Sequence, residues 1–188
     1  MALNPVRSLL LFVVLIVANG CGDLSTSDEL SVASEHRMVT VERVVDGDTI
    51  EVSPAIDGIE DVRLIGIDTP EKFGTDGPQP LAEAATNFTE STLRDSKNSV
   101  ELRFDVEKID QYGRLLAYVY TTDGEMLNKA LILGGHAQAA SFPPNIRHRD
   151  KFEDAQEEAR DLELGIWNLP RDRSCELADR GNGIGGGC

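Results

Sequence analysis

Two short acidic segments hold the side chains best suited to chemistry. Asp46 and Asp48 flank a glycine at a turn between two β-branched runs, and Asp68 precedes Thr69 at the end of a later run. Carboxylate and carbonyl oxygens are the hard ligands that Ca²⁺ prefers. If these strand ends are neighbours, Asp48, Asp68 and the Thr69 carbonyl can bind Ca²⁺, with water as the remaining ligands. An alternative stays open, because Asp-Gly and Asp-x-Pro are also ordinary turn and capping sequences.

Two arginines, a tyrosine and a glutamate add groups that suit an anionic substrate. Arg63 lies in an otherwise apolar run, where its guanidinium must face solvent, a carboxylate or an anionic ligand. Arg114 follows a turn that carries Tyr112, and Glu71 could activate a water molecule. Each residue alone also fits a structural ion pair or a hairpin. Together with the aspartates they suit phosphodiester hydrolysis, because guanidinium groups bind phosphate oxygens and stabilise the transition state.

The composition limits how such a site could be presented. The chain has 188 residues, 33 acidic against 18 basic side chains, a formal net charge of −15 and 40% hydrophobic residues. These values fit one modest globular domain and exclude disordered, fibrous and multi-pass membrane proteins. The acidic balance also excludes binding to nucleic acid through a broad basic surface. Any nucleic-acid chemistry must therefore be confined to a local site.

Hydrophobic periodicity predicts the elements that position these residues, in the order βββαββαα. The strands are expected over residues 38–45, 50–53, 62–67, 100–106 and 115–120. The helices are expected over 80–94, from Leu127 to Leu131, and from Phe152 to Ile166. Five closely spaced strands predict an α+β domain with a strongly curved sheet or a five-stranded, partly open β-barrel, covered by about three helices.

The N-terminal end reads as a targeting segment. Residues 1–20 contain one arginine and a ten-residue apolar run, which predicts a signal peptide. The run is about half of the roughly 20 residues that a transmembrane helix needs. Cys21 follows small residues, so lipid attachment there and free secretion are both open, and the protein is expected to be exported in either case. Residues 21–37 are expected to form a flexible spacer.

The C-terminal end, residues 169–188, is a glycine-rich tail that we do not expect to contribute to the core. Cys175 and Cys188 are available as a disulfide pair in a compartment that permits disulfides. Two unpaired thiols in the tail are the alternative.

Four segments between residues 38 and 168 form an ordered series. They are VDGDT (45–49), RLIGIDTPE (63–71), DQYGRLLAYV (110–119) and GIW (165–167). Together they resemble the thermonuclease family, the staphylococcal-nuclease-like domains. The resemblance implies an OB-fold α+β domain and a Ca²⁺-dependent nuclease that hydrolyses DNA and RNA and leaves 3′-phosphate ends.

The resemblance also implies a role for each matching residue. It makes Asp48, Asp68 and Thr69 the Ca²⁺ ligands, with Asp46 supporting them. It makes Arg63 and Arg114 the phosphate contacts of the reaction, Glu71 the general base and Tyr112 a nucleotide contact.

The sequence departs from the family pattern in two places. Gln111 stands where a basic residue would assist phosphate binding. In residues 141–144, Phe142 is left as the candidate that stacks on a base. Both departures predict a weaker grip on the substrate.

We therefore expect an exported Ca²⁺-dependent nuclease, a monomer tethered to the membrane through Cys21, with DNA and RNA as substrates. Two alternatives stay open: an OB-fold module that binds an oligonucleotide or a protein without catalysis, and a domain in which the acids hold a structural Ca²⁺. A binding module has no chemical need for Glu71, and nearby arginines oppose a purely structural cation site. The complete set therefore favours the nuclease.

Overall fold

The computed structural model describes residues 36–74 and 77–185. Predictions for the signal peptide, for lipid attachment at Cys21 and for residues 21–35 of the spacer lie outside these residues. Five strands form a closed barrel in the order β1-β2-β3-β6-β5. Their bounds are β1 His36–Asp46, β2 Thr49–Ile56, β3 Ile59–Leu64, β5 Ser99–Ile109 and β6 Leu115–Thr121. The spacer prediction is wrong at His36 and Arg37, because both pair with β5 as the start of β1.

The barrel is closed by one parallel pairing in an otherwise antiparallel sheet. β1 pairs with both β2 and β5, whereas β3 pairs with β6 in parallel. This mixed five-stranded barrel with helices confirms the predicted OB-fold α+β class, and the barrel is closed rather than partly open. Within the described residues, closure gives each barrel strand a neighbour on both sides, which removes the free edges of an open sheet.

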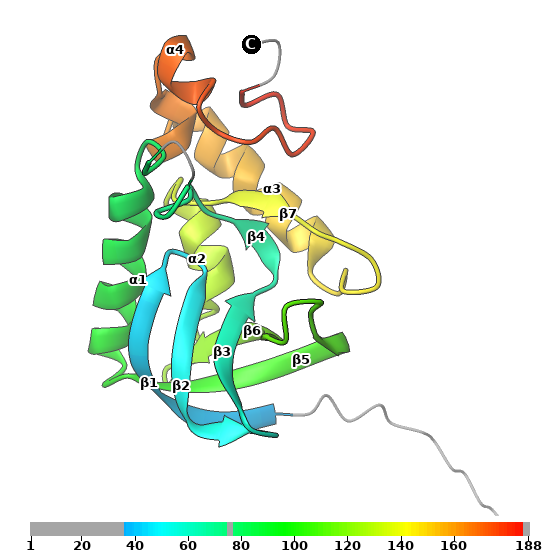
Figure 1. Ribbon diagram of the computed structural model, residues 1–188. Helices are drawn as coiled ribbons and strands as arrows, with labels where there is room; N and C mark the ends of the chain where they lie inside the picture. Colours follow the sequence, from blue (N-terminus) through cyan, green and yellow to red (C-terminus); the bar gives the residue numbers. More distant parts are fainter. Residues whose placement is uncertain (1–35, 75–76, 186–188) are drawn as a thin grey trace, which may run out of the picture. The chain divides into compact units, whose positions relative to one another are not determined.

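In the described part of the chain, one helical segment precedes β5 and four follow β6. They are α1 Ala82–Asp95, α2 Leu127–Leu133, α3 Arg149–Asp161, the 3₁₀ helix η1 Gly165–Asn168, and α4 Arg171–Ser174. α1 runs along β1 (Figure 1). Within the described ranges, no helix is long and apolar enough to cross a membrane.

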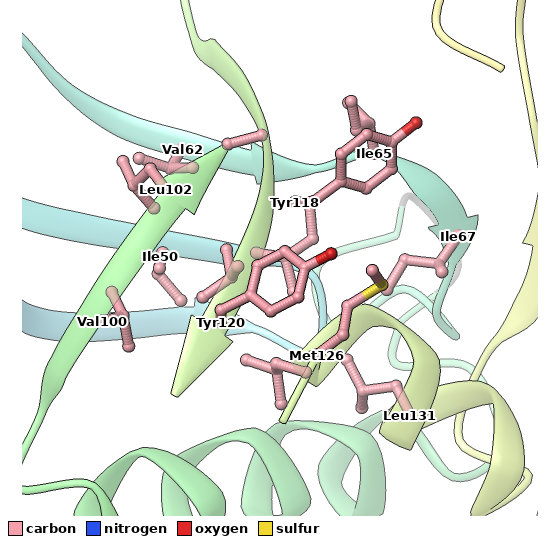
Figure 2. Close-up of a cluster of buried hydrophobic side chains, with 14 of the residues drawn as sticks. Ile50, Val62, Ile65, Ile67, Val100, Leu102, Tyr118, Tyr120, Met126 and Leu131 are labelled. Atoms are coloured by element: carbon pink, nitrogen blue, oxygen red, sulfur yellow. The ribbon is translucent and has the colours of Figure 1, made fainter. Parts of the chain in front are cut away.

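The core fills the barrel and extends to the helices. Ile50, Val62 and Leu102 come from the barrel strands, and Met126 and Leu131 approach them from the α2 side (Figure 2). All five are buried. For the three strand residues, this burial matches the alternation of inward and outward side chains along a strand. The buried core therefore stabilises the barrel strands whose turns carry the candidate site residues.

The predicted third strand is wrong in one respect, because it is two strands. β3 ends at Leu64, and β4, Gly66–Asp68, leaves the barrel and pairs with β7, Gln138–Ala140. Gly66 adopts a φ of +80°, a conformation that L side chains rarely tolerate. The resulting bend carries Asp68 away from the barrel wall.

The last predicted helix is also too long. α3 ends at Asp161, because Glu163 and Gly165 both adopt positive φ values. Leu162 is exposed as a result, while Ile166 packs elsewhere, with Leu177 and Ile184.

The tail therefore contributes to a core, contrary to expectation. Leu177 and Ile184 are both buried. Cys175 is disulfide-bonded, and its pairing with Cys188 stays a prediction because Cys188 lies outside the described residues.

Candidate active site

One cleft of about 740 Å³ collects nearly all the predicted site residues. Its lining includes Asp46, Asp48, Arg63, Asp68, Glu71, Tyr112, Arg114 and Phe142. Thr69 lies behind this lining, bonded to Asp48. The structure thus brings together residues that are up to 96 positions apart in the chain.

Asp48 lies at the tip of the β1–β2 hairpin and is held from three sides. Its Oδ2 atom accepts hydrogen bonds from the Thr69 backbone N–H and the Thr69 hydroxyl, both at 2.8 Å. Its Oδ1 atom pairs with Nη1 of Arg63. The residue is only 3% exposed. A buried carboxylate needs such partners, because isolated charges are strongly disfavoured away from water.

Helix α1 fixes the position of this hairpin tip. A Cβ atom on Gly47 would lie 2.8 Å from the Thr69 side chain and 2.9 Å from Ala85 of α1, so the position has room for glycine alone. The Thr89 hydroxyl of α1 donates to the Gly47 carbonyl at 2.7 Å. The Asp-Gly-Asp segment is therefore a tightly packed turn that aims the Asp48 carboxylate into the cleft.

Arg63 occupies the middle of the barrel wall. It is paired in register with Thr49 of β2 and Leu116 of β6. Its Nη2 atom lies 3.3 Å from Oδ1 of Asp68 and donates to the Ile67 carbonyl at 3.2 Å. Burial lowers the pKa of its guanidinium, and the neighbouring carboxylates oppose this effect. A cation held between two aspartates at the cleft floor is well placed to contact a phosphate.

Arg114 is oriented by Asp110 across the β5–β6 turn. Oδ1 of Asp110 accepts the backbone N–H groups of Tyr112 and Arg114, and Oδ2 accepts Nε of Arg114 at 2.8 Å. Burial acts to raise the pKa of Asp110, but these hydrogen bonds outweigh it and the pKa is lowered. Asp110 thus stays charged and keeps Arg114 directed toward the cleft.

Glu71 follows β4 and is braced through its backbone. The Glu71 backbone N–H donates to Oε1 of Gln79, and the Gln79 backbone N–H donates to the Glu71 carbonyl. Desolvation, followed by repulsion from Asp46 and Asp68, raises the pKa of Glu71. A carboxylate with a raised pKa is a better proton acceptor, as a general base requires.

Two exposed aromatic side chains lie in the cleft wall. Tyr112 is 75% exposed and Phe142 is 63% exposed, so both offer a ring face to solvent. Asn145 holds the Phe142 segment in place, because its side chain donates to the Glu107 carbonyl and accepts the Glu107 N–H. Aromatic faces of this kind stack with nucleobases.

Sequence reasoning missed three residues of this site. Asp110 and Gln79 position Arg114 and Glu71, and Arg180 donates from Nε to Oδ2 of Asp68 at 2.8 Å. Asp110 opens the turn before Arg114, and aspartates in turns commonly bond to nearby backbone N–H groups, so a local signal was present. No local pattern pointed to Arg180, because it lies in the tail.

The cleft lining contains oxygen donors of the kind that Ca²⁺ binds. Asp48 and Asp68 are both buried, and one guanidinium contacts both, so their oxygens converge at the cleft floor. Within residues 36–74 and 77–185, no group of three or more His, Cys, Asp or Glu side chains has the arrangement of a metal site. Two buried carboxylates nevertheless fit a hard cation whose other ligands are mostly water.

A family model described as staphylococcal nuclease homologue matches residues 61–169. A thermonuclease of Staphylococcus intermedius is 46% identical over 129 residues, which cover 68% of this chain and 74% of the relative. The chain belongs to the staphylococcal nuclease homologue family.

Two further relatives support membership of this family. A thermonuclease of Staphylococcus hyicus is 40% identical over 141 residues, covering 74% of this chain and 80% of the relative. The SPbeta prophage-derived endonuclease YokF of Bacillus subtilis (strain 168) is 37% identical over 146 residues, which cover 76% of this chain and 47% of the relative. The matched family segment contains Arg63, Asp68, Glu71 and Arg114, and it ends before Arg180.

Proposed function

We propose that this protein is an exported, Ca²⁺-dependent nuclease that hydrolyses phosphodiester bonds in DNA and RNA and leaves 3′-phosphate ends. Family membership and the named thermonuclease and endonuclease relatives support the coarser statement, that the chain is a hydrolytic nuclease. The observation that carries the proposal is the convergence of Arg63, Arg114 and Glu71 with two buried aspartates in one cleft.

The chain's own groups suffice to describe how the reaction is organised. Arg63 and Arg114 approach the cleft from β3 and from the start of β6, so a phosphodiester between them receives donors from two directions. Charge-assisted hydrogen bonds of this kind strengthen as negative charge develops on the phosphate oxygens. The two arginines therefore bind the transition state more tightly than the substrate.

Glu71 supplies the proton acceptor. Its carboxylate takes a proton from water as the water oxygen forms a bond to phosphorus. The bond between phosphorus and the 5′ oxygen breaks, and the 5′ oxygen takes up a proton from solvent. The phosphate stays on the 3′ oxygen of the preceding nucleotide, which accounts for a 3′-phosphate product.

Asp48, Asp68 and the Thr69 carbonyl are the groups that would hold Ca²⁺. When bound, the ion supplies electrostatic polarisation of the phosphate and offsets the negative charge of the cleft. The need for such an offset is evident in the lining, where six carboxylates accompany three arginines.

Export rests on the N-terminal segment. The apolar run in residues 1–20 and the cysteine at position 21 support a signal peptide with lipid attachment at Cys21. The cleft does not depend on this segment, since every residue that lines it lies between positions 46 and 180.

Cleavage assays on the purified protein test this function. Single- and double-stranded DNA and RNA should be hydrolysed with Ca²⁺ and left intact with a chelator. Arg63→Ala, Arg114→Ala and Glu71→Ala should each lower kcat by about 10²–10³-fold or more, because each removes a group used in the transition state. Arg43→Ala is the matched control, because Arg43 pairs with Glu51 outside the cleft.

Two results would contradict the proposal. Full activity in Arg63→Ala would exclude the assigned role of the cleft. Oligonucleotide binding by folded protein, without cleavage under any metal condition, would instead indicate a non-catalytic OB-fold module.

A further inference from the structure

The segment after α4 is anchored on both sides of Arg180. Leu177 and Ile184 are buried together with Ile166. Between them, the Ala178 carbonyl accepts a hydrogen bond from Nε2 of Gln138 at 3.0 Å. Figure 1 draws this segment as the red trace that follows α4. These contacts hold the segment against the rest of the domain and place Arg180 in the lining of the cleft.

Asn182 adds a further anchor on the far side of Arg180. Its side-chain amide donates to Oε1 of Gln138 at 2.7 Å, and its Oδ1 accepts the Ile184 N–H. Gln138 therefore bonds to the tail on either side of Arg180. These contacts hold the tail without help from the arginine.

Arg180 uses only one edge of its guanidinium. Nε donates to Oδ2 of Asp68 at 2.8 Å, and the side chain is 34% exposed. Among the described residues, Nη1 and Nη2 have no hydrogen-bond partner. Arg180 lines the cleft, so its two terminal nitrogens are available to a group bound there.

The other two arginines of the cleft are more fully engaged. Arg63 bonds through both terminal nitrogens, to Asp48 and to Asp68. Arg114 bonds through Nε and Nη2 to Asp110. Of the three, Arg180 alone has both terminal nitrogens available for the bidentate contact that guanidinium makes with phosphate.

A purely structural ion pair accounts poorly for this arrangement. A partly exposed ion pair contributes little to stability, and the tail is already held by Gln138 and by two buried aliphatic side chains. An arginine is nevertheless held rigidly beside Asp68, in a cleft whose substrate is a polyanion.

We propose that Arg180 is a third phosphate-binding residue, which grips a backbone phosphate of the nucleic acid through Nη1 and Nη2 while Nε remains on Asp68. The inference rests on the proposed nuclease function. Arg180 lies beyond the family match at residues 61–169, so the tail supplies a contact that the matched segment does not contain. It would partly compensate for Gln111, which stands where a basic residue was expected.

The test is equilibrium binding rather than turnover. The full protein is titrated against a fluorescein-labelled oligothymidylate in the presence of a chelator, and anisotropy is followed across a salt series. Arg180→Gln should weaken binding about tenfold or more. The slope of log K against log salt should fall in magnitude by about 0.7, the value for one phosphate contact with a single strand.

Two variants sharpen this comparison. Arg173→Gln removes the same charge from the same tail, at a residue that pairs with Glu176 outside the cleft, and should leave affinity and slope unchanged. Arg180→Lys should keep the salt slope but bind more weakly than wild type, because lysine cannot make the bidentate contact. All variants share the same acidic surface. Its repulsion of the oligonucleotide therefore contributes equally to each salt slope and drops out when two slopes are subtracted.

Arg180→Gln could also weaken binding by displacing the tail, so a second measurement uses the wild-type protein. Phenylglyoxal reacts with the terminal nitrogens of arginine, and mass spectrometry locates the modified residues. Bound oligothymidylate should protect Arg180 from modification and leave Arg173 as reactive as before. Equal modification of Arg180 with and without oligonucleotide would overturn the proposal, as would wild-type affinity and slope in Arg180→Gln.

The two proposals fail in different ways. Calcium-dependent cleavage by wild type together with unchanged binding in Arg180→Gln would contradict the role of Arg180 and support the nuclease function. Loss of binding in Arg180→Gln without cleavage by wild type would support the phosphate contact and contradict the catalytic function.

Discussion

Gly66 is the point where the chain leaves the barrel, and its replacement by alanine offers a demanding test of the structure. Gly66 separates β3, which carries Arg63, from β4, which ends at Asp68. Its φ is +80°, and a Cβ atom there would lie 2.4 Å from Cε2 of Phe152. Real side chains do not approach this closely, so either Phe152 or the bend must move.

Two separate penalties make up the expected loss of stability. A non-glycine residue in the left-handed region costs about 1–2 kcal/mol, and overpacking a well-filled core costs about 1–3 kcal/mol. Gly66→Ala should therefore reduce the free energy of unfolding by about 2–5 kcal/mol. Gly58→Ala is the matched control, because Gly58 has a φ of +81° with nothing within 4 Å of its added Cβ. It should show only the first penalty.

Urea and thermal unfolding of both variants would measure the difference. For a domain of this size, about 1 kcal/mol corresponds to roughly 2–4 °C in Tm, so Gly66→Ala should unfold several degrees below Gly58→Ala. Adding Phe152→Leu should be less harmful in the Gly66→Ala background than in wild type, since the smaller side chain relieves the contact. Equal losses for the two alanine variants, with no coupling to Phe152, would refute the packing described for this bend.

Two further predictions concern buried polar groups. Asn128→Ala should lower the free energy of unfolding by about 1–3 kcal/mol in urea titrations, because the buried amide accepts the Val119 N–H and donates to the Ile65 carbonyl, both at 2.9 Å; a neutral effect would mean that neither group depends on it. His136 packs against Phe88, and burial lowers its pKa, so the folded state binds the proton less readily than the unfolded chain. The stability of wild type relative to His136→Gln should therefore be greatest above about pH 6.5 and fall as the pH decreases below that value. Urea titrations at pH 8, 6 and 5 check this, and a difference independent of pH would contradict it.

Local patterns in the sequence predicted much of this molecule. The Asp-Gly turn and its β-branched flanks predicted the β1–β2 hairpin, and the spacing of Leu81, Ala85 and Phe88 predicted α1. These features depend on neighbouring residues, so they can be read without knowledge of the fold. The chemistry of the site was readable for the same reason, because its residue types stand in short motifs at strand ends.

The prediction was wrong where a local pattern had two physical solutions. The apolar run 62–67 fits one strand, but β4 pairs with β7, some 70 residues further along the chain. The spacing from Phe152 to Ile166 fits one helix, but positive φ values at Glu163 and Gly165 end it early. Pairing with a distant strand decided the first outcome and the backbone conformation of two residues decided the second, and hydrophobic periodicity reports neither.

The residue types, their order and the reaction they suit were thus determined by the sequence alone. Their assembly into a cleft was decided by the tertiary structure, because β3 pairs in parallel with β6 and thereby brings Arg63 beside the strand that Arg114 precedes. Arg180 shows the limit most clearly. Its tail joins the site because Leu177 and Ile184 pack with Ile166 and because Gln138 bonds to the tail on either side of Arg180. Burial of this kind depends on a surface that exists only after the chain has folded.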